Sequence, residues 1–205
     1  MKKYIYEGKN FEEVKEKALQ ELNIKEEDTI INILEEKQGL LKKSVKIEIT
    51  TVQDIISFIK ETINKILDLM SISANLEVRR RENNIEIKIF SEHNSILIGH
   101  EGRTLDSFQN IIRQIVSHEI GDKYRVMIDI ENYRDKKISN LERTVKRIAR
   151  EVKLTKVETK LEPMNSYERR IVHNALSKNK YVYTESVGEE PNRCVVIKLK
   201  EEPKE

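Results

Sequence analysis

Two glycines three positions apart, Gly99 and Gly102, enclose His100 and Glu101 near the middle of the chain, and Arg103 follows them. The absence of a Cβ atom at both glycines lets another backbone come close to this loop. An apolar helical pattern begins directly after Gly102, so the free N–H groups of its first turn can receive a phosphate. The loop is the first candidate for a phosphate-binding site. The alternative for such a pattern is a tight turn between two packed helices.

The second candidate is the pair Arg169 and His173, which stand at positions i and i+4 of a helical segment. At this spacing both side chains are expected to project from one face, opposite a buried side made of Ile171, Val172, Ala175 and Leu176. An arginine can bind a phosphate through two parallel hydrogen bonds, and a histidine adds another donor. Arg170 and Arg193 complete this candidate nucleic-acid-binding site. For an isolated pair, an exposed arginine and a histidine with a structural partner would be the usual interpretation.

The elements around the glycine loop follow from apolar periodicity. A stripe at spacing i, i+3, i+4 and i+7 predicts a helix over residues 52–70. Alternating residues predict strands near 76–80 and 85–89, joined by a two-residue turn at Asn83-Asn84. A short helix at 95–98, the glycine loop, a helix with Leu105, Phe108 and Ile112 inward, and a strand near 124–130 complete this region.

The flanking regions form two further modules. Residues 1–50 predict the order β-α-β-β, with strands near 3–7, 29–34 and 45–49 and a helix over 11–22. After residue 132 a basic amphipathic helix is predicted, then a helix near 167–176 and strands near 181–186 and 194–199. Asn165 and Glu168 predict a capping pair before the second helix. The fold class is therefore α+β in three small modules: 1–50, 51–131 and 132–205.

The element order of residues 51–131, with Ile98-Gly99 before and Thr104-Leu105 after the loop, resembles the type II KH (K-homology) fold, α-β-β-α-α-β. The resemblance implies that the loop clamps about four nucleotides of single-stranded RNA or DNA. The two loop positions of that family usually include a basic residue, whereas here they are His100 and Glu101. A carboxylate opposite phosphates lowers affinity, and a histidine is mostly neutral at pH 7. Arg103 is expected to compensate.

The segment from Pro163 to His173 resembles the nucleic-acid-binding domain named for its Arg-x-x-x-His signature, and residues 188–197 resemble the end of that domain. A KH domain joined to such a domain by a basic helix is similar to the Jag/KhpB (EloR) family of bacterial RNA-binding proteins. Residues 1–50 resemble its N-terminal Jag domain in element order. That domain's Lys-Lys-Gly-Phe-like loop corresponds to Lys37-Gln38-Gly39-Leu40-Leu41. The long linker common between the Jag and KH domains is missing.

The resemblance implies a cytoplasmic, non-enzymatic protein that binds RNA, or single-stranded DNA, as an RNA chaperone or post-transcriptional regulator. It also implies a small single-KH protein partner, homodimerisation through the KH domain as an option, and control of cell-wall synthesis and cell shape. It implies no cofactor and no metal. These functions are expectations from the family.

Charge and composition agree with a soluble protein whose nucleic-acid contacts are local. Residues 1–50 carry 10 basic and 11 acidic side chains, residues 51–131 carry 10 and 13, and residues 132–205 carry 18 and 12. Only the last third, at a net +6, has the sign expected of a phosphate-binding surface. Cys194 is the only cysteine, which favours a reducing compartment, and no apolar run reaches the roughly 18 residues of a membrane span.

Catalysis is disfavoured by the motifs. The four histidines and one cysteine show none of the common zinc spacings, and neither a nucleophile elbow nor a phosphate-binding Walker loop is found. Arg169 and His173 could serve a nuclease only with a further acid or base, and the sequence places none beside them. The stronger alternative is a protein-interaction adaptor, because residues 51–131 are net acidic and the loop carries Glu101.

Overall fold

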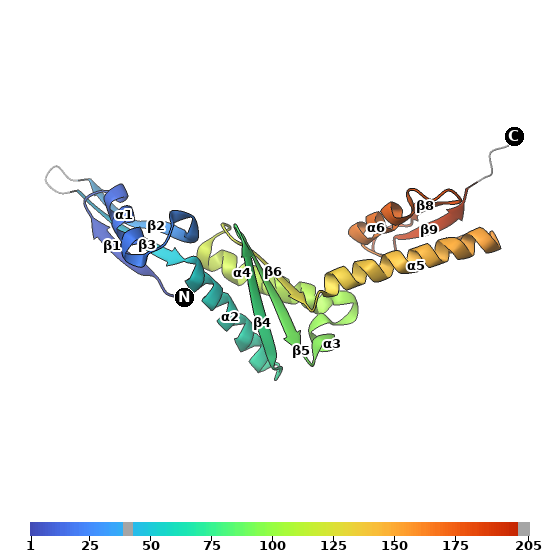
Figure 1. The fold of residues 1–205 in the computed structure, drawn as a ribbon, viewed down its shortest axis with the longest axis horizontal. Coiled ribbons are helices and arrows are strands. Elements are labelled where there is room, and N and C mark those ends of the chain that lie inside the picture. Colours follow the sequence, from blue (N-terminus) through green and yellow to red (C-terminus); the bar gives the residue numbers. More distant parts are fainter. Residues whose placement is uncertain (39–42, 201–205) are drawn as a thin grey trace. The chain divides into compact units, whose positions relative to one another are not determined.

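The computed structural model describes residues 1–38 and 43–200. The chain folds as two compact units, Met1–Glu131 and Asn132–Glu205, whose elements are labelled in Figure 1. Both units mix helices with antiparallel or mixed sheets, so the predicted α+β class is confirmed. Residues 39–41 of the loop that resembles the Jag family lie outside the described residues.

The first unit begins with a β-α-β-β module. It contains β1 (Tyr4–Gly8), α1 (Phe11–Leu22), the short 3-10 helix η1 (Glu26–Asp28), β2 (Thr29–Gln38) and β3 (Lys43–Thr51). The sheet order is β1-β3-β2, fully antiparallel, with β3 in the centre. Figure 1 shows α1 beside this sheet. Val14 and Ala18 of α1 pack against Val45, Ile47 and Ile49 of β3, which makes a small core.

The same unit continues without a linker into the KH module. β3 ends at Thr51 and α2 (Val52–Leu69) starts at the next residue, with Thr51 Oγ1 accepting a hydrogen bond from the Asp54 N–H at 3.1 Å. Contacts beyond the chain connection also join the modules. The Arg80 guanidinium pairs with the Asp28 carboxylate, and the Lys123 ammonium donates to the Thr29 carbonyl oxygen. The N-terminal module is therefore attached to the KH module through covalent continuity and polar contacts.

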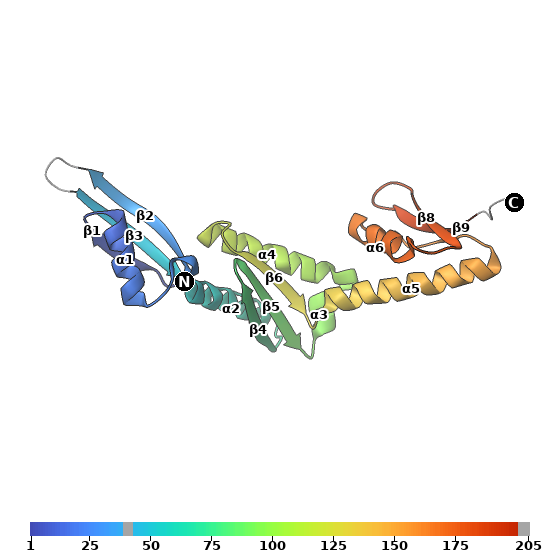
Figure 2. The same ribbon diagram turned by 45° about the horizontal axis from the view of Figure 1, so that its top comes forward.

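The KH module has α2, β4 (Ala74–Arg81), β5 (Asn84–Ser91), α3 (Asn94–Ile98), the 3-10 turn η2 (His100–Gly102), α4 (Arg103–Ile120) and β6 (Arg125–Ile130). Its sheet order is β4-β5-β6, with β4 antiparallel and β6 parallel to β5. Figure 2 shows α4 running beside β6 after the short helix α3. The predicted element order is confirmed. Alternate residues of β5 and β6 are fully buried, as are the apolar stripes of α2 and α4.

One local prediction in this module is wrong. Arg81 pairs with Asn84, so the two-residue turn between β4 and β5 is Glu82-Asn83, one position earlier than Asn83-Asn84. Glu82 adopts the left-handed conformation with φ 52°. Register is the reason for the shift: Ile85, Ile87 and Ile89 must all face the core, and this places Asn84 in the strand.

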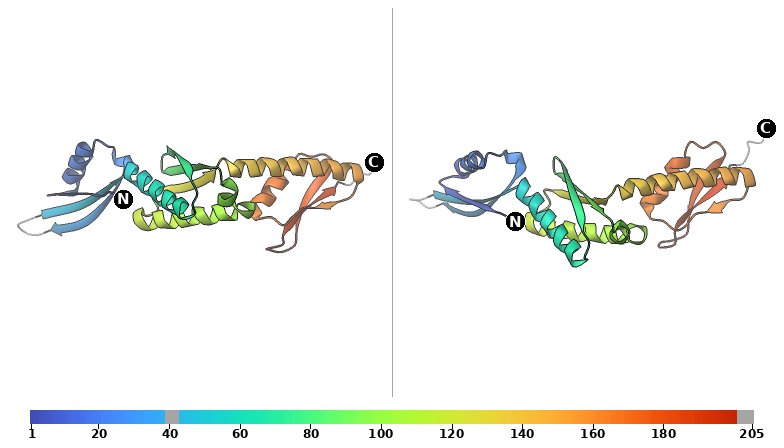
Figure 3. Two further views of the ribbon diagram at one scale, coloured as in Figure 1. Left: turned by 90° about the horizontal axis from the view of Figure 1, so that it is seen from below. Right: turned by 60° about the horizontal axis from the view of Figure 1, so that its bottom comes forward.

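The second unit packs two helices on one sheet. It contains α5 (Tyr133–Thr155), β7 (Thr159–Lys160), α6 (Ser166–Leu176), β8 (Val182–Val187) and β9 (Cys194–Leu199), with sheet order β7-β9-β8. Figure 3 shows α5 running along this sheet. The core consists of small aliphatic side chains: Val145, Ala149, Val152, Val172, Leu176, Val182, Val195 and Ile197. The two-residue strand β7 was not predicted, because two residues carry no measurable periodicity.

Candidate nucleic-acid interface

The glycine loop connects α3 to α4 through two residues that need a glycine backbone. Gly99, the C-cap of α3, has φ 68° and ψ −173°, a region that glycine alone occupies readily. A Cβ atom there would overlap Thr104 Oγ1 and lie 2.7 Å from Thr104 Cβ. Gly99 is therefore required by the close approach of α3 to α4 inside the domain, independently of any ligand.

Gly102 closes the loop as the N-cap of α4, with φ 89°. A glycine has no side chain with which to cap the N–H groups of the first turn. α4 is 18 residues long, so the positive end of its dipole lies at this loop. The backbone geometry thus suits an anion beside Gly102, and phosphate binding at this loop stays a prediction.

The side chains of the loop are exposed and mutually paired. Glu101 has φ 56°, and its side chain is 54% exposed. Its Oε2 lies 3.6 Å from Arg103 Nη2 and 3.9 Å from His100 Nδ1. The positive charge of Arg103 is accordingly shared with the Glu101 carboxylate, so its compensation of the loop charge is partial.

The predicted capping pair before α6 is confirmed. Asn165 Oδ1 accepts a hydrogen bond from the Glu168 N–H at 2.9 Å, and the Asn165 N–H donates to Glu168 Oε2 at 3.1 Å. Lys137 of α5 pairs with the same carboxylate at 2.6 Å. This arrangement sets the start of α6, and thereby the directions in which Arg169 and His173 point.

The expectation that Arg169 projects from the exposed side of α6 is wrong. Its side chain is only 9% exposed, and Arg169 lies on the buried face with Val172 and Leu176. Arg169 Nη1 donates to the Met164 carbonyl oxygen and to Glu190 Oε1, both at 2.8 Å. The four apolar residues of α6 predicted a narrower buried face than the structure has. The loop that contains Glu190 covers the side of α6 that carries Arg169, so this side is buried as well.

His173 lies between α6 and β8, and both of its ring nitrogens have hydroxyl partners. Nδ1 is 2.5 Å from Thr184 Oγ1, and Nε2 is 3.1 Å from Ser186 Oγ. Thr184 and Ser186 are alternate residues of β8, so they face the helix together. His173 therefore ties α6 to the edge strand of the sheet.

The other two predicted basic residues of this domain are exposed. Arg170 follows Arg169 on α6 but points to solvent, and Arg193 is exposed just before β9. The Arg193 carbonyl oxygen accepts a hydrogen bond from the Met164 N–H at 3.1 Å, which joins the two segments. Of the four predicted residues, Arg170 and Arg193 are the ones whose charges are presented to solvent.

Sequence reasoning missed Glu190, Thr184 and Ser186, the partners of Arg169 and His173. Glu190 lies in the segment that resembled the family, but Glu189 precedes it, and no pattern says which acid meets the arginine. The alternation of Thr184 and Ser186 along a predicted strand was the only available signal for the histidine partners.

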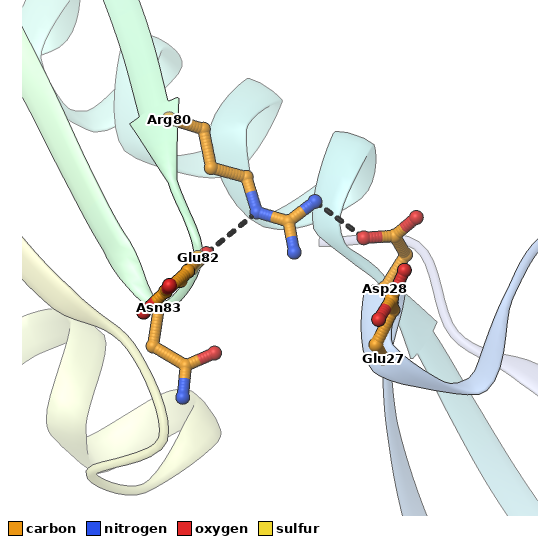
Figure 4. Close-up of a pocket in the computed structure, with 5 residues that line it drawn as sticks. All are labelled: Glu27, Asp28, Arg80, Glu82 and Asn83. Carbon is orange, nitrogen blue, oxygen red and sulfur yellow. Dashed lines mark hydrogen bonds and ion pairs between the residues drawn. The ribbon is translucent and has the colours of Figure 1, made fainter.

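An open pocket of about 420 Å³ lies where the N-terminal module meets the KH module (Figure 4). Its lining residues are Glu27, Asp28, Arg80, Glu82 and Asn83. Arg80 Nε donates to the Glu82 carbonyl oxygen at 2.8 Å, and its Nη1 pairs with Asp28. One paired cation among three carboxylates makes the pocket a poor site for a phosphate.

Burial raises the pKa of Tyr124, and the charge of Asp28 raises it further, whereas Arg80 opposes the shift. The Tyr124 hydroxyl thus remains a neutral donor, 3.4 Å from the Glu27 carbonyl oxygen. This contact adds to the polar junction between the two modules.

Within 1–38 and 43–200, no three or more His, Cys, Asp or Glu side chains are grouped as metal ligands. Over the same ranges, no helix has the length and apolar character that crossing a bilayer requires.

Three domain models match the chain: Jag N-terminus over residues 6–51, the KhpA/KhpB KH domain over 56–128, and the Arg-x-x-x-His domain over 139–199. The chain is 40% identical over 203 residues to RNA-binding protein KhpB of Clostridium symbiosum, covering 95% of this chain and 90% of the relative. It is 30% identical over 200 residues to RNA-binding protein KhpB of Bacillus subtilis, covering 94% and 96%. The chain therefore belongs to the Jag/KhpB family, as its motifs indicated.

Proposed function

We propose that this protein binds single-stranded RNA without catalysing a reaction on it, as an RNA chaperone or post-transcriptional regulator of the cytoplasm. The observation that carries the proposal is the loop from Gly99 to Arg103, where an uncapped helix start and exposed side chains meet at the surface of a KH domain. Backbone N–H groups hold the RNA phosphates, and Arg103 adds a permanent cation whose charge the Glu101 carboxylate partly offsets.

In the Arg-x-x-x-His domain, the exposed Arg170 and Arg193 provide phosphate contacts. Arg169 and His173 hold this surface in place, since Arg169 connects α6 to the loop at Glu190 and His173 connects it to β8. The net charge of +6 over residues 132–205 supports phosphate binding by this part of the chain.

The second candidate function is that of a protein-interaction adaptor. It is favoured by the pairing of Glu101 with Arg103, which lowers the positive charge of the loop, and by the net acidic composition of residues 51–131. A surface of this charge suits a protein partner better than it suits RNA.

Charge reversal at Arg103 separates the two functions. Arg103 is 77% exposed, so Arg103→Glu should leave the fold intact. We expect the full chain carrying it to bind a single-stranded RNA oligonucleotide several-fold more weakly. Arg113→Glu, an exposed arginine ten residues farther along α4, serves as the matched control. Equal affinity of both variants and the original chain would favour the adaptor.

We further propose pairing with a small single-KH protein, or with a second copy of this chain, through α2. The edge of β6 could also offer a pairing surface, but Gln109 of α4 already engages it within the domain. Gln109 Nε2 donates to the Val126 carbonyl oxygen at 2.7 Å, and the Ile128 N–H donates to Gln109 Oε1 at 2.6 Å. Sedimentation of the full chain, alone and with the small KH protein, tests this pairing. A strict monomer in both cases contradicts it.

A role in cell-wall synthesis and cell shape is proposed as the downstream consequence of RNA binding. Replacement of the chromosomal copy by the Arg103→Glu variant should then alter cell dimensions in the same direction as deletion. Normal cell shape in cells that carry this variant, despite its weakened RNA binding, would show that the role in cell shape does not depend on RNA binding at this loop.

A further inference from the structure

Tyr181 lies in the turn between α6 and β8, and its side chain is exposed on a fixed backbone. Its exposed fraction is 51%. Asn179 Oδ1 accepts hydrogen bonds from the Tyr181 N–H at 2.9 Å and the Val182 N–H at 3.2 Å, and the Lys200 N–H donates to the Tyr181 carbonyl oxygen at 2.8 Å. These hydrogen bonds fix the backbone that carries the ring.

One cation lies on this ring, and three others belong to the segments around it. Lys153 of α5 places its Nζ 3.4 Å from the ring centroid, and Arg150 lies one turn earlier on the same helix. Lys180 precedes Tyr181, and Lys200 Nζ donates to the Asn179 carbonyl oxygen at 2.8 Å. In the part of the chain that the structure describes, no carboxylate forms an ion pair with these four cations.

A second exposed tyrosine nearby has the opposite charge environment. Tyr183 is 44% exposed and is the second residue of β8, two positions after Tyr181. Lys198, which stands opposite it in the sheet, pairs with Glu185 at 2.8 Å and with Glu158 at 3.9 Å. Two carboxylates thus pair with the one cation at Tyr183, whereas Lys153 at Tyr181 forms no ion pair with a carboxylate among the described residues.

We propose that Arg150, Lys153, Lys180, Tyr181 and Lys200, the Tyr181 platform, form a second RNA subsite that stacks one unpaired base and holds the adjoining phosphates. Every base has an aromatic face that can stack on a tyrosine, and nearby cations bind the backbone. Because Lys153 covers one face of the Tyr181 ring, the base stacks on the opposite face. A base in a duplex cannot leave its stack without cost, so the platform selects single strands. The proposal rests on RNA binding as the function of the chain and names a subsite distinct from the Arg-x-x-x-His residues.

The test measures binding of the full chain to a labelled 12-nucleotide single-stranded RNA and to the matched duplex, by fluorescence anisotropy over a series of salt concentrations. Tyr181→Leu should weaken single-strand binding about tenfold, the usual effect of losing one stacked base, with the salt slope unchanged. Tyr181→Phe should bind as tightly as the original chain, because stacking does not use the hydroxyl. Lys153→Gln should lower the salt slope by about one phosphate contact.

Tyr183→Leu is the matched control, because Tyr183 lies two residues after Tyr181 and has a similar exposed fraction, and it should change affinity less than twofold. Equal binding by Tyr181→Leu and Tyr183→Leu overturns the platform while RNA binding itself stands. Absence of RNA binding by the original chain overturns both proposals. A third outcome would assign the patch to anionic lipid and overturn the RNA subsite. In that case the chain binds phosphatidylserine vesicles, Lys153→Gln abolishes this binding, and neither Lys153→Gln nor Tyr181→Leu changes the affinity for RNA.

Discussion

Glu101→Lys should strengthen RNA binding at the KH loop. The substitution changes the loop by two charge units and releases Arg103 from the carboxylate 3.6 Å away. The residue is exposed, and its φ of 56° is as accessible to lysine as to glutamate, so the backbone cost cancels. The effect on affinity is therefore electrostatic.

The magnitude follows from Coulomb's law with screening. One unit charge at roughly 7 Å from a phosphate contributes about 0.6 kcal/mol in water, so two units contribute about 1.2 kcal/mol. In 10 mM salt, screening leaves about 0.9 kcal/mol, or about fivefold in affinity. In 0.15 M salt, about 0.5 kcal/mol remains, or about twofold. Glu101→Gln should give about half of each free-energy change.

The assay is fluorescence anisotropy of the full chain with a single-stranded RNA at both salt concentrations. Glu119→Lys is the control, because it makes the same change 16 residues beyond Arg103 on the same helix, about 24 Å away at 1.5 Å per residue. At that distance the gain should stay below about 1.5-fold. Unchanged affinity of Glu101→Lys in 10 mM salt, or an equal gain from Glu119→Lys, would show that the RNA backbone does not pass over this loop.

Three further predictions concern the residues that hold the sites in place. Gly99→Ala should lower the free energy of unfolding in urea by about 1–3 kcal/mol more than Gly121→Ala does. Both glycines have φ near 70°, but only a side chain at position 99 would meet Thr104. Equal losses of stability would contradict that packing. Arg169→Gln should lower the melting temperature and leave the salt slope of RNA binding unchanged. Arg170→Gln should instead lower the salt slope by about one phosphate contact. The reverse pattern would make Arg169 the phosphate ligand. Arg80→Ala should destabilise the first unit by about 1 kcal/mol, since the ion pair of Arg80 with Asp28 is partly exposed. It should also speed hydrogen exchange at η1. Unchanged exchange would mean that the junction between the two modules does not depend on this ion pair.

Much of the candidate site could be predicted from local sequence because its signals are local. The Gly-x-x-Gly loop, the apolar stripe of α2 and the Asn165–Glu168 capping pair each depend on residues within a few positions of one another. Local dihedral preferences and side-chain periodicity act at that range, so the pattern and the structure agree.

The environment of each basic residue could not be predicted in this way. Arg169 and Arg170 are adjacent in sequence, yet one is buried against Glu190 and the other faces solvent. A helical wheel separates them by about 100°, but the packed arc depends on whether a distant loop covers the helix. Glu190 in that loop is 21 positions from Arg169, and the position of the loop is set by the sheet strands that it connects.

The sequence by itself determined the three domain types, the order of nearly all the elements and the loop at Gly99, since these depend on periodicity, capping and glycine conformation. Tertiary structure alone decided that Arg169 is buried, that Gln109 covers the edge of β6, that Arg80 joins two modules through Asp28, and that Lys153 lies on the ring of Tyr181. These contacts join residues 17 to 52 positions apart. Such pairs carry no local signature, because they arise only after packing of the apolar faces has fixed where each polar side chain can reach.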